Sequence, residues 1–304
     1  MFVLRRAVAC YAIVLVLLQP AAFGWGEDGH QLINRVAAEK VPASMPSFLR
    51  EAADRIAYLG PEPDRWREKS ELQLKNSQEP DHFIDLERID DMPSLPPTRY
   101  EFIRALYDKR ARMAQNADDY LPEKVGFQPY ITMEVYGRLK VAFREYRRLK
   151  EAKESTAGVE QNIVYYAGWL GHYVGDGANP LHTTIQYNGW VGDNPKGYTT
   201  AHTIHWEMEG AFVARNIKQL KIADLIRDPI RLQDPFADYV RYLRQSRELV
   251  ENVYQLEKAG GFKDAGSPEA LEFVRHRLAA GTQMVLNLWY TAWEESAVPV
   301  PAKN

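Results

Sequence analysis

Histidine and carboxylate residues stand at helical spacing in two places along the chain. His172 and Asp176 are four residues apart, and so are His205 and Glu209. Side chains at positions i and i+4 lie on one face of a helix, where both can bind the same cation. Imidazole and carboxylate groups suit zinc, and a carboxylate can also bridge two ions. The two pairs therefore predict two segments of a metal centre.

The alternative interpretation of either pair is a surface ion pair on a solvated helix face. His172 favours coordination, because it lies in an apolar stretch between Leu170 and Tyr173. A polar side chain buried there without a partner costs roughly 1–3 kcal/mol or more. Metal coordination would satisfy the buried imidazole and the carboxylate of Asp176 together.

Further residues of the same types lie at other points of the chain. His182 follows Asp176 by six residues, just after a proline that should end the helix. His30 lies near the start of the expected mature chain. Asp64 and His82 lie in a proline-rich stretch over 60–97. A coordinating loop is a physical reason for so long an irregular stretch to stay ordered.

In their order along the chain, these residues resemble the S1/P1 nuclease and zinc-dependent phospholipase C superfamily. Its members begin the mature chain with Trp and a nearby His, then carry an Asp, a His, an H-x3-D-x5-H helix and a final His-x3-Asp or His-x3-Glu. The resemblance covers about residues 25–210, and the C-terminal third shares only helical character. The matching positions are Trp25, His30, Asp64, His82, His172, Asp176, His182, His205 and Glu209.

The resemblance implies an all-α domain built around a cluster of three zinc ions. It also implies a division of the ligands, in which Trp25 contributes its free amine and its carbonyl. The division is Asp64, His82, His172 and Asp176 for one ion, Trp25 and His30 with the bridging Asp176 for the second, and His182, His205 and Glu209 for the third.

The chemistry that this resemblance implies is hydrolysis of a phosphodiester. A water between the first two ions would become hydroxide near neutral pH and attack phosphorus, which makes Asp64 and Asp176 catalytic as well as ligating. The third ion would stabilise the charge that develops on the phosphate. Arg67 matches an Asp-x-x-Arg element of the family and would contact the phosphoryl group. Its alternative interpretation is a surface arginine.

Two substrate classes stay open. Phe83 and Asp85 resemble a nuclease segment in which the aromatic ring stacks on a base and the aspartate hydrogen-bonds it. Core packing is the alternative for Phe83. Against a nuclease, the final ligand is Glu209, as in phospholipase C, where nucleases more often carry Asp. The chain after Trp25 also lacks the cysteines that form disulfides in fungal nucleases. The sequence favours a P1-type single-strand nuclease, with phospholipase C acting on phospholipid headgroups as the alternative and a non-catalytic zinc-binding protein as a third.

The elements that must position these residues are expected to be helices in one domain over 25–298. A loop rich in Gly, Asn and Thr is expected over 183–200, with Tyr187, Trp190 and Tyr198, and a frayed tail over 299–304. His202 and His276 match no ligand position. The expected helices are Gln31 to about Ile56 with interruptions near Pro42 and Pro46, Arg99–Asn116, Thr132–Lys153, Val159 to about Asp176, His202–Asn216, Phe236–Gln255 and Pro268–Trp293.

Residues 1–24 are expected to be a signal peptide that is cut before Trp25. Arg5 and Arg6 precede an apolar run, and Ala22 and Gly24 provide small residues at the cleavage site. A membrane anchor is the alternative, but the run is shorter than the roughly 20 residues that span a bilayer. The prediction is therefore a secreted or periplasmic monomer without a transmembrane segment or an implied protein partner.

The charge of the chain is nearly balanced, with 38 Lys and Arg against 41 Asp and Glu. This balance gives no basic footprint of the kind that binds nucleic acid by electrostatics alone. Bound cations could supply positive charge to the site instead. A substrate of single-stranded nucleic acid or phospholipid therefore remains compatible with the composition.

Overall fold

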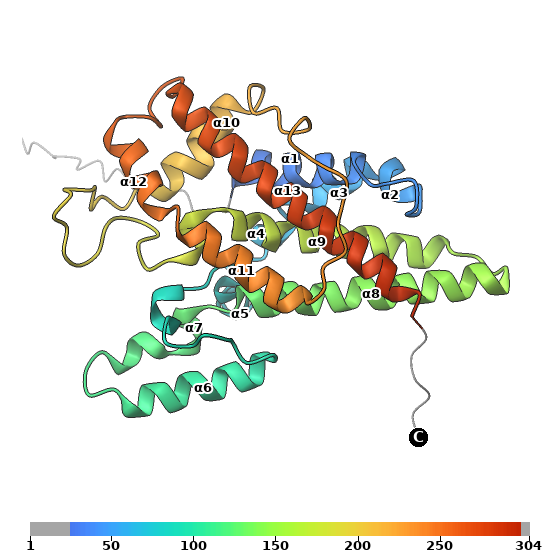
Figure 1. Ribbon diagram of the computed structural model, residues 1–304, viewed down its shortest axis with the longest axis horizontal. Helices are drawn as coiled ribbons and strands as arrows, with labels where there is room; N and C mark the ends of the chain where they lie inside the picture. The colour runs from blue at the N-terminus through green and yellow to red at the C-terminus, as the bar shows by residue number, and fades with distance from the viewer. Residues whose placement is uncertain (1–24, 299–304) are drawn as a thin grey trace, which may run out of the picture.

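The computed structural model describes residues 25–298, and over this range the protein is all-α, as predicted (Figure 1). No β-strand occurs between Trp25 and Val298. The α-helices are α1 (Gly26–Glu39), α2 (Phe48–Glu51), α3 (Ala53–Leu59), α4 (Glu62–Arg65), α5 (Leu72–Gln78), α6 (Arg99–Arg112), α7 (Pro122–Val125), α8 (Gln128–Ala152), α9 (Ala157–Ala178), α10 (Val213–Asn216), α11 (Pro235–Arg247), α12 (Val250–Lys258) and α13 (Pro268–Ser296). Short 3-10 helices are η1 (Glu79–His82), η2 (Leu86–Ile89), η3 (Ala117–Tyr120) and η4 (Pro180–Thr183), and η5 (Trp206–Phe212) is a π-helix.

Helix α9 is the centre of the arrangement. It packs against α8, α13, α3 and α1, and α13 crosses over it in Figure 1. The apolar sequence of α9 accounts for this position, because its residues from Leu170 to Ala178 are all buried. A helix with apolar residues around most of its circumference is stable only when neighbouring elements cover it.

Glycines on α9 allow α1 to approach closely. A Cβ on Gly171 would lie 1.8 Å from Asn34 Oδ1, and one on Gly175 would lie 3.1 Å from His30 Nδ1. Asn34 Nδ2 then donates to one carbonyl of α3 and one of α9, at 3.0 and 2.9 Å. This close packing brings His30 against the ligand-bearing face of α9.

The helix boundaries agree with the sequence in most places, although α1 begins at Gly26 rather than Gln31 and α8 at Gln128 rather than Thr132. Three segments differ more. The expected helix Phe236–Gln255 is two helices, α11 and α12, separated at Glu248 and Leu249. The stretch 60–97 holds α4, α5, η1 and η2 rather than irregular chain alone. The expected helix His202–Asn216 is a π-helix followed by the short α10.

Two predictions concern residues outside the described range, namely the signal peptide over 1–24 and the tail over 299–304. Within 25–298, no helix combines the length and the apolar character that a membrane span requires.

Candidate metal centre

The eight side chains predicted to bind metal come together from separate parts of the fold. They come from α1, α4, η1, α9, η4, the π-helix and the residue before the π-helix, and none is more than 7 % exposed. Their donor atoms form three groups that could each hold a cation. The groups are His30 with Asp64 and His172, His82 with His172 and Asp176, and His182 with His205 and Glu209.

The group of His82, His172 and Asp176 is nearly an equilateral triangle. His82 Nδ1 lies 3.0 Å from His172 Nε2 and 3.0 Å from Asp176 Oδ2, and the latter two atoms are 3.2 Å apart. At the roughly 2.0–2.1 Å bond lengths usual for zinc, tetrahedral donor atoms lie about 3.3 Å apart. Asp64 Oδ1 approaches the same triangle, at 3.7 Å from His82 Nδ1.

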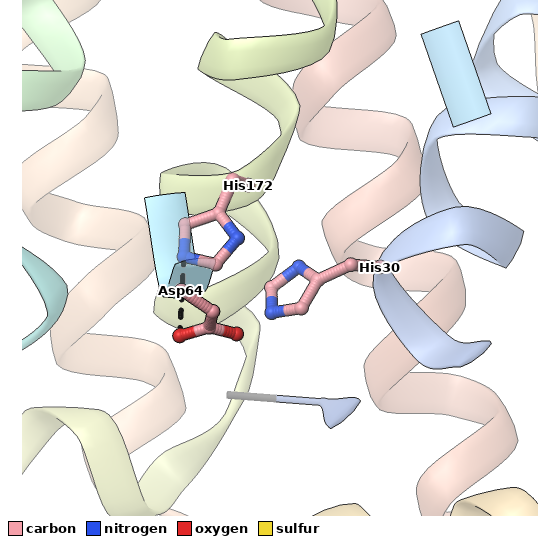
Figure 2. Close-up of side chains that lie close together, drawn as sticks. All are labelled: His30, Asp64 and His172. Carbon is pink, nitrogen blue, oxygen red and sulfur yellow. Dashed lines mark ion pairs between the residues drawn. The ribbon is translucent and has the colours of Figure 1, made fainter. Parts of the chain in front are cut away.

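Asp176 faces two groups with its two oxygens. Its Oδ1 lies 3.3 Å from His30 Nε2, on the opposite side from the Oδ2 contacts with His82 and His172. Figure 2 shows His30 reaching from α1 toward His172 on α9, with Asp64 below. The two imidazole rings are stacked with centroids 4.1 Å apart. The Asp176 carboxylate thus contacts members of both groups, and the residue that the two groups share is His172.

The third group has the same triangular form. His182 Nε2 and His205 Nε2 are 3.1 Å apart, and Glu209 Oε2 lies 3.2 and 2.9 Å from them. Glu209 belongs to the π-helix, and His205 immediately precedes it. A π-helix is rare and occurs mostly at functional sites.

Backbone carbonyls hold two of the imidazole rings in one tautomer. His172 Nδ1–H donates to the Gly60 carbonyl and His182 Nδ1–H to the His82 carbonyl, both at 2.8 Å. A carbonyl only accepts, so in the neutral imidazole each Nε2 carries a lone pair that faces its group. Metal-ligating histidines are usually oriented in this way.

Asn179 is a member of the site that the sequence did not suggest. Its Nδ2 donates to Glu209 Oε2 at 2.6 Å, and its Oδ1 accepts from the Leu181 backbone at 3.0 Å. Its side chain thus caps the start of η4 and orients a ligand. Because Asn before Pro is a common turn signal, the residue was recognisable as a turn residue but not as a site residue.

The protonation of the groups suits a cation. Burial opposes ionisation of Asp176, but His172 and His182 hold its pKa well below the usual range. Burial lowers the pKa of His82 to about 4, which keeps its imidazole neutral at ordinary pH. Burial opposes protonation of His182, yet Asp176 and Glu209 raise its pKa to about 9. A cation would replace that proton.

One oxygen of each of three buried carboxylates has no hydrogen-bond partner among the described residues. These atoms are Asp64 Oδ2, Asp176 Oδ1 and Glu209 Oε1. A buried carboxylate oxygen without a partner is costly unless a cation lies beside it. Together with the donor types and the triangular spacing, these atoms indicate that the residues fit bound metal ions.

A cleft of about 720 Å³ opens onto the centre. His82, His182 and His205 line it, so two of the three groups can be reached from it. Arg67 also lines it, with Nη1 at 3.3 Å from Asp64 Oδ1 and Nη2 at 3.5 Å from a Glu79 oxygen. The guanidinium is therefore held at the edge of the centre rather than on the outer surface.

Phe83 and Asp85 line the same cleft. The Phe83 ring is half-buried and is not part of the hydrophobic core. Its backbone carbonyl lies so close to Gly126 that a Cβ there would come within 2.1 Å of it. Gly126 also has φ +90°, a conformation that favours glycine. This turn holds the backbone beside Phe83 in place.

Asp85→Asn is expected to stabilise the protein more at pH 8 than at pH 4. Burial, and then the charge of Glu87, raise the pKa of Asp85 to about 7 from an ordinary 3.8. Folding therefore favours the neutral carboxyl, and wild-type stability falls as pH rises from the unfolded pKa to the folded one. The loss amounts to at most about 4 kcal/mol. Urea unfolding at several pH values measures it, and a pH-independent difference between the two proteins would contradict it.

Trp25 is fully buried beside two ligand-bearing segments. Its Nε1 donates to the Gly175 carbonyl at 2.7 Å, next to Asp176. The neighbouring Gly26 lies against the π-helix, since a Cβ on it would be 3.3 Å from the Glu209 carbonyl. The first described residue is thus adjacent to the centre.

His202 and His276 are exposed and take no part in any of the three groups. His276 Nε2 instead lies 2.8 Å from a Glu272 oxygen. In comparisons with known proteins, no family model and no curated sequence matches this chain.

Proposed function

We propose that this protein is a zinc-dependent phosphodiester hydrolase of the S1/P1 nuclease and phospholipase C type. The observation that carries the proposal is the convergence of three buried donor groups on one cleft that an arginine also lines. Donor sets of imidazole and carboxylate without thiolate suit zinc, and the 2.9–3.2 Å spacings suit tetrahedral coordination. The order of the ligands along the chain supports the family, with residues 25–298 as one catalytic domain exported after cleavage before Trp25.

Bound zinc ions would act as Lewis acids that polarise the phosphate and acidify a water. The residues of the chain have separate tasks. Arg67 donates N–H groups to a phosphate oxygen, and Asp64 keeps its guanidinium at the centre. Asp176 positions His30 through Oδ1, and His82 and His172 through Oδ2. Asn179 fixes the rotamer of Glu209.

A nucleic-acid substrate is supported by Phe83 and Asp85. The half-buried Phe83 ring offers a stacking surface, and stacking tolerates any base. Asp85, with its pKa raised to about 7 by burial and Glu87, can present a neutral carboxyl that both donates and accepts. A base edge carries complementary donors and acceptors.

One observation supports phospholipase C as the second candidate. Helix α5 exposes Leu72 and Leu74, which are 64 % and 41 % exposed, and buries no residue. Asn76 of the same helix lines the cleft. Apolar side chains beside the entrance to a site could contact a lipid surface.

A side-by-side assay of the zinc-loaded protein that begins at Trp25 tests the proposal. Single-stranded DNA, RNA, phosphatidylcholine and a small generic phosphodiester are the substrates, and zinc content is measured in the same samples. We expect cleavage of single-stranded nucleic acid. Cleavage of the lipid alone would establish the second candidate. Bound zinc with no hydrolysis of any substrate would indicate a non-catalytic zinc protein.

Phe83→Ala is expected to raise KM for single-stranded nucleic acid by roughly tenfold, the order of one lost stacking contact. Hydrolysis of the small phosphodiester should change little, because that substrate has no base to stack. Phe83→Tyr, which keeps the ring, serves as the control and should behave like wild type. Equal losses on both substrates would mean that Phe83 acts through folding of the site.

A further inference from the structure

The loop after η4 is fixed on both sides of Tyr187. Tyr254 Oη–H donates to the Gln186 carbonyl at 2.5 Å, and the same oxygen accepts from the Gly189 backbone at 3.1 Å. The Gln186 side chain also bonds both backbone groups of Val191, at 3.0 and 2.6 Å. The backbone that carries Tyr187 is therefore held in one conformation.

The other two aromatic residues of this loop are used for packing. Trp190 and Tyr198 lie with their ring centroids 5.1 and 5.5 Å from that of Tyr254, and Tyr198 is only 5 % exposed. Tyr187 differs, since it is 53 % exposed on the same fixed loop. Its side chain is displayed to solvent instead of contributing to the packing.

Tyr187 lies in the wall of the cleft, next to the His182–His205–Glu209 group. It lines the cleft, and its ring centroid is 6.1 Å from that of His205, with an angle of 69° between the planes. An exposed aromatic ring on a rigid support can stack at little entropic cost, because few rotamers are lost on binding.

The backbone around Phe83 is bonded to the other histidine of the same group. The Ile84 backbone donates to the His182 carbonyl at 2.9 Å, and His182 Nδ1–H donates to the His82 carbonyl at 2.8 Å. The backbone on either side of Phe83 is thus tied to His182. Phe83, whose flanking backbone bonds His182, and Tyr187, whose ring contacts His205, therefore line a single cleft. The ring centroids of the two histidines are 4.9 Å apart.

We propose that Tyr187 is the second wall of an aromatic clamp that, with Phe83, holds one base of a single-stranded nucleic acid beside the His182–His205–Glu209 group. The inference rests on the proposed nuclease function and specifies its substrate. A base has two flat faces and can stack on both, at roughly 1–3 kcal/mol per aromatic contact. The glycerol and headgroup of a phospholipid have no such faces. The cleft volume of about 720 Å³ accommodates a nucleotide.

Binding of adenosine monophosphate and of ribose 5-phosphate to the zinc-loaded protein tests the clamp directly. The two probes share sugar and phosphate and differ in the base. We expect wild type to bind the nucleotide more tightly, and Tyr187→Leu to weaken nucleotide binding about tenfold while ribose 5-phosphate binding stays unchanged. Tyr187→Phe should retain wild-type affinity for both. Tyr107→Leu, at a tyrosine of α6 that is 47 % exposed and outside the cleft lining, is the matched control.

Hydrolysis of a dinucleotide and of its two singly abasic analogues adds a second readout. Both Tyr187→Leu and Phe83→Leu should raise KM for the dinucleotide, and both effects should vanish on the same abasic analogue. Effects that vanish on different analogues, or zinc loss in Tyr187→Leu, would overturn the clamp. Failure of wild type to cleave any nucleic acid, with cleavage of phosphatidylcholine, would instead overturn the nuclease proposal itself.

Discussion

Asp176→Ala is expected to remove more metal than any other single ligand substitution and to lower phosphodiester hydrolysis by roughly two to three orders of magnitude or more. Asp176 is the one ligand whose two oxygens face different histidines, with Oδ2 near His82 and His172 and Oδ1 near His30. Its removal therefore takes a contact from members of two adjacent groups at once, whereas loss of His205 affects one group. Metal analysis after dialysis against zinc-free buffer measures the effect.

Asp81→Asn is the matched control for this substitution. Asp81 is also buried, at 3 % exposure, but its Oδ1 lies 2.7 Å from Arg99 Nη1 and it faces no donor group. We expect this variant to keep its zinc. Full metal occupancy in Asp176→Ala would refute the bridging role. Equal metal loss in both variants would mean that any buried carboxylate change disturbs the centre.

The sequence was sufficient to predict the helical class and the ligand-bearing face of α9. His172 and Asp176 are local neighbours on one helix, and the apolar residues around them require burial whatever packs there. The long helices α8 and α13 were predictable for the same reason, since their periodic patterns extend over many turns. Local patterns therefore identified both the central element and its polar face.

The features that the sequence did not indicate depend on contacts between distant segments. Nothing near Gly60 suggests that its carbonyl orients His172, because the two are 112 residues apart. Asn179 contacts a glutamate 30 residues away. The break between α11 and α12 falls in a stretch without Gly or Pro, so propensity alone could not locate it.

The loop over 183–200 also contains a difference between residues that the sequence could not predict. From the sequence alone, Tyr187, Trp190 and Tyr198 are three aromatic residues of one loop that cannot be told apart in role. Their difference follows from Tyr254, which lies on α12, packs with Trp190 and Tyr198, and bonds the backbone beside Tyr187. Exposure on a fixed support, rather than residue type, separates the substrate candidate from the packing residues.

Protein that begins at Trp25 is expected to bind one more zinc ion, and to be faster by orders of magnitude, than protein extended by a single N-terminal methionine. The free amine of Trp25 is a good ligand once deprotonated, whereas the extension turns it into a peptide N–H that coordinates zinc poorly. The position of Trp25 supports this role, because its indole bonds Gly175 beside Asp176 and the next residue lies against Glu209. In the proposed mechanism two ions would acidify one water, and loss of one of them would return that water toward ordinary acidity.

A third protein tests the contributions of the Trp25 amine and the Trp25 side chain separately. Trp25→Phe, made so that the chain begins at that residue, keeps the amine and loses the indole bond to the Gly175 carbonyl. We expect it to retain its zinc content and most of its rate while losing about 1 kcal/mol of stability. The methionine-extended protein keeps the indole and should show the opposite pattern, with the ion near His30 lost and the side-chain-held ions retained. Equal zinc content and equal rates in the extended and processed proteins would show that Trp25 is a packing residue and not a ligand.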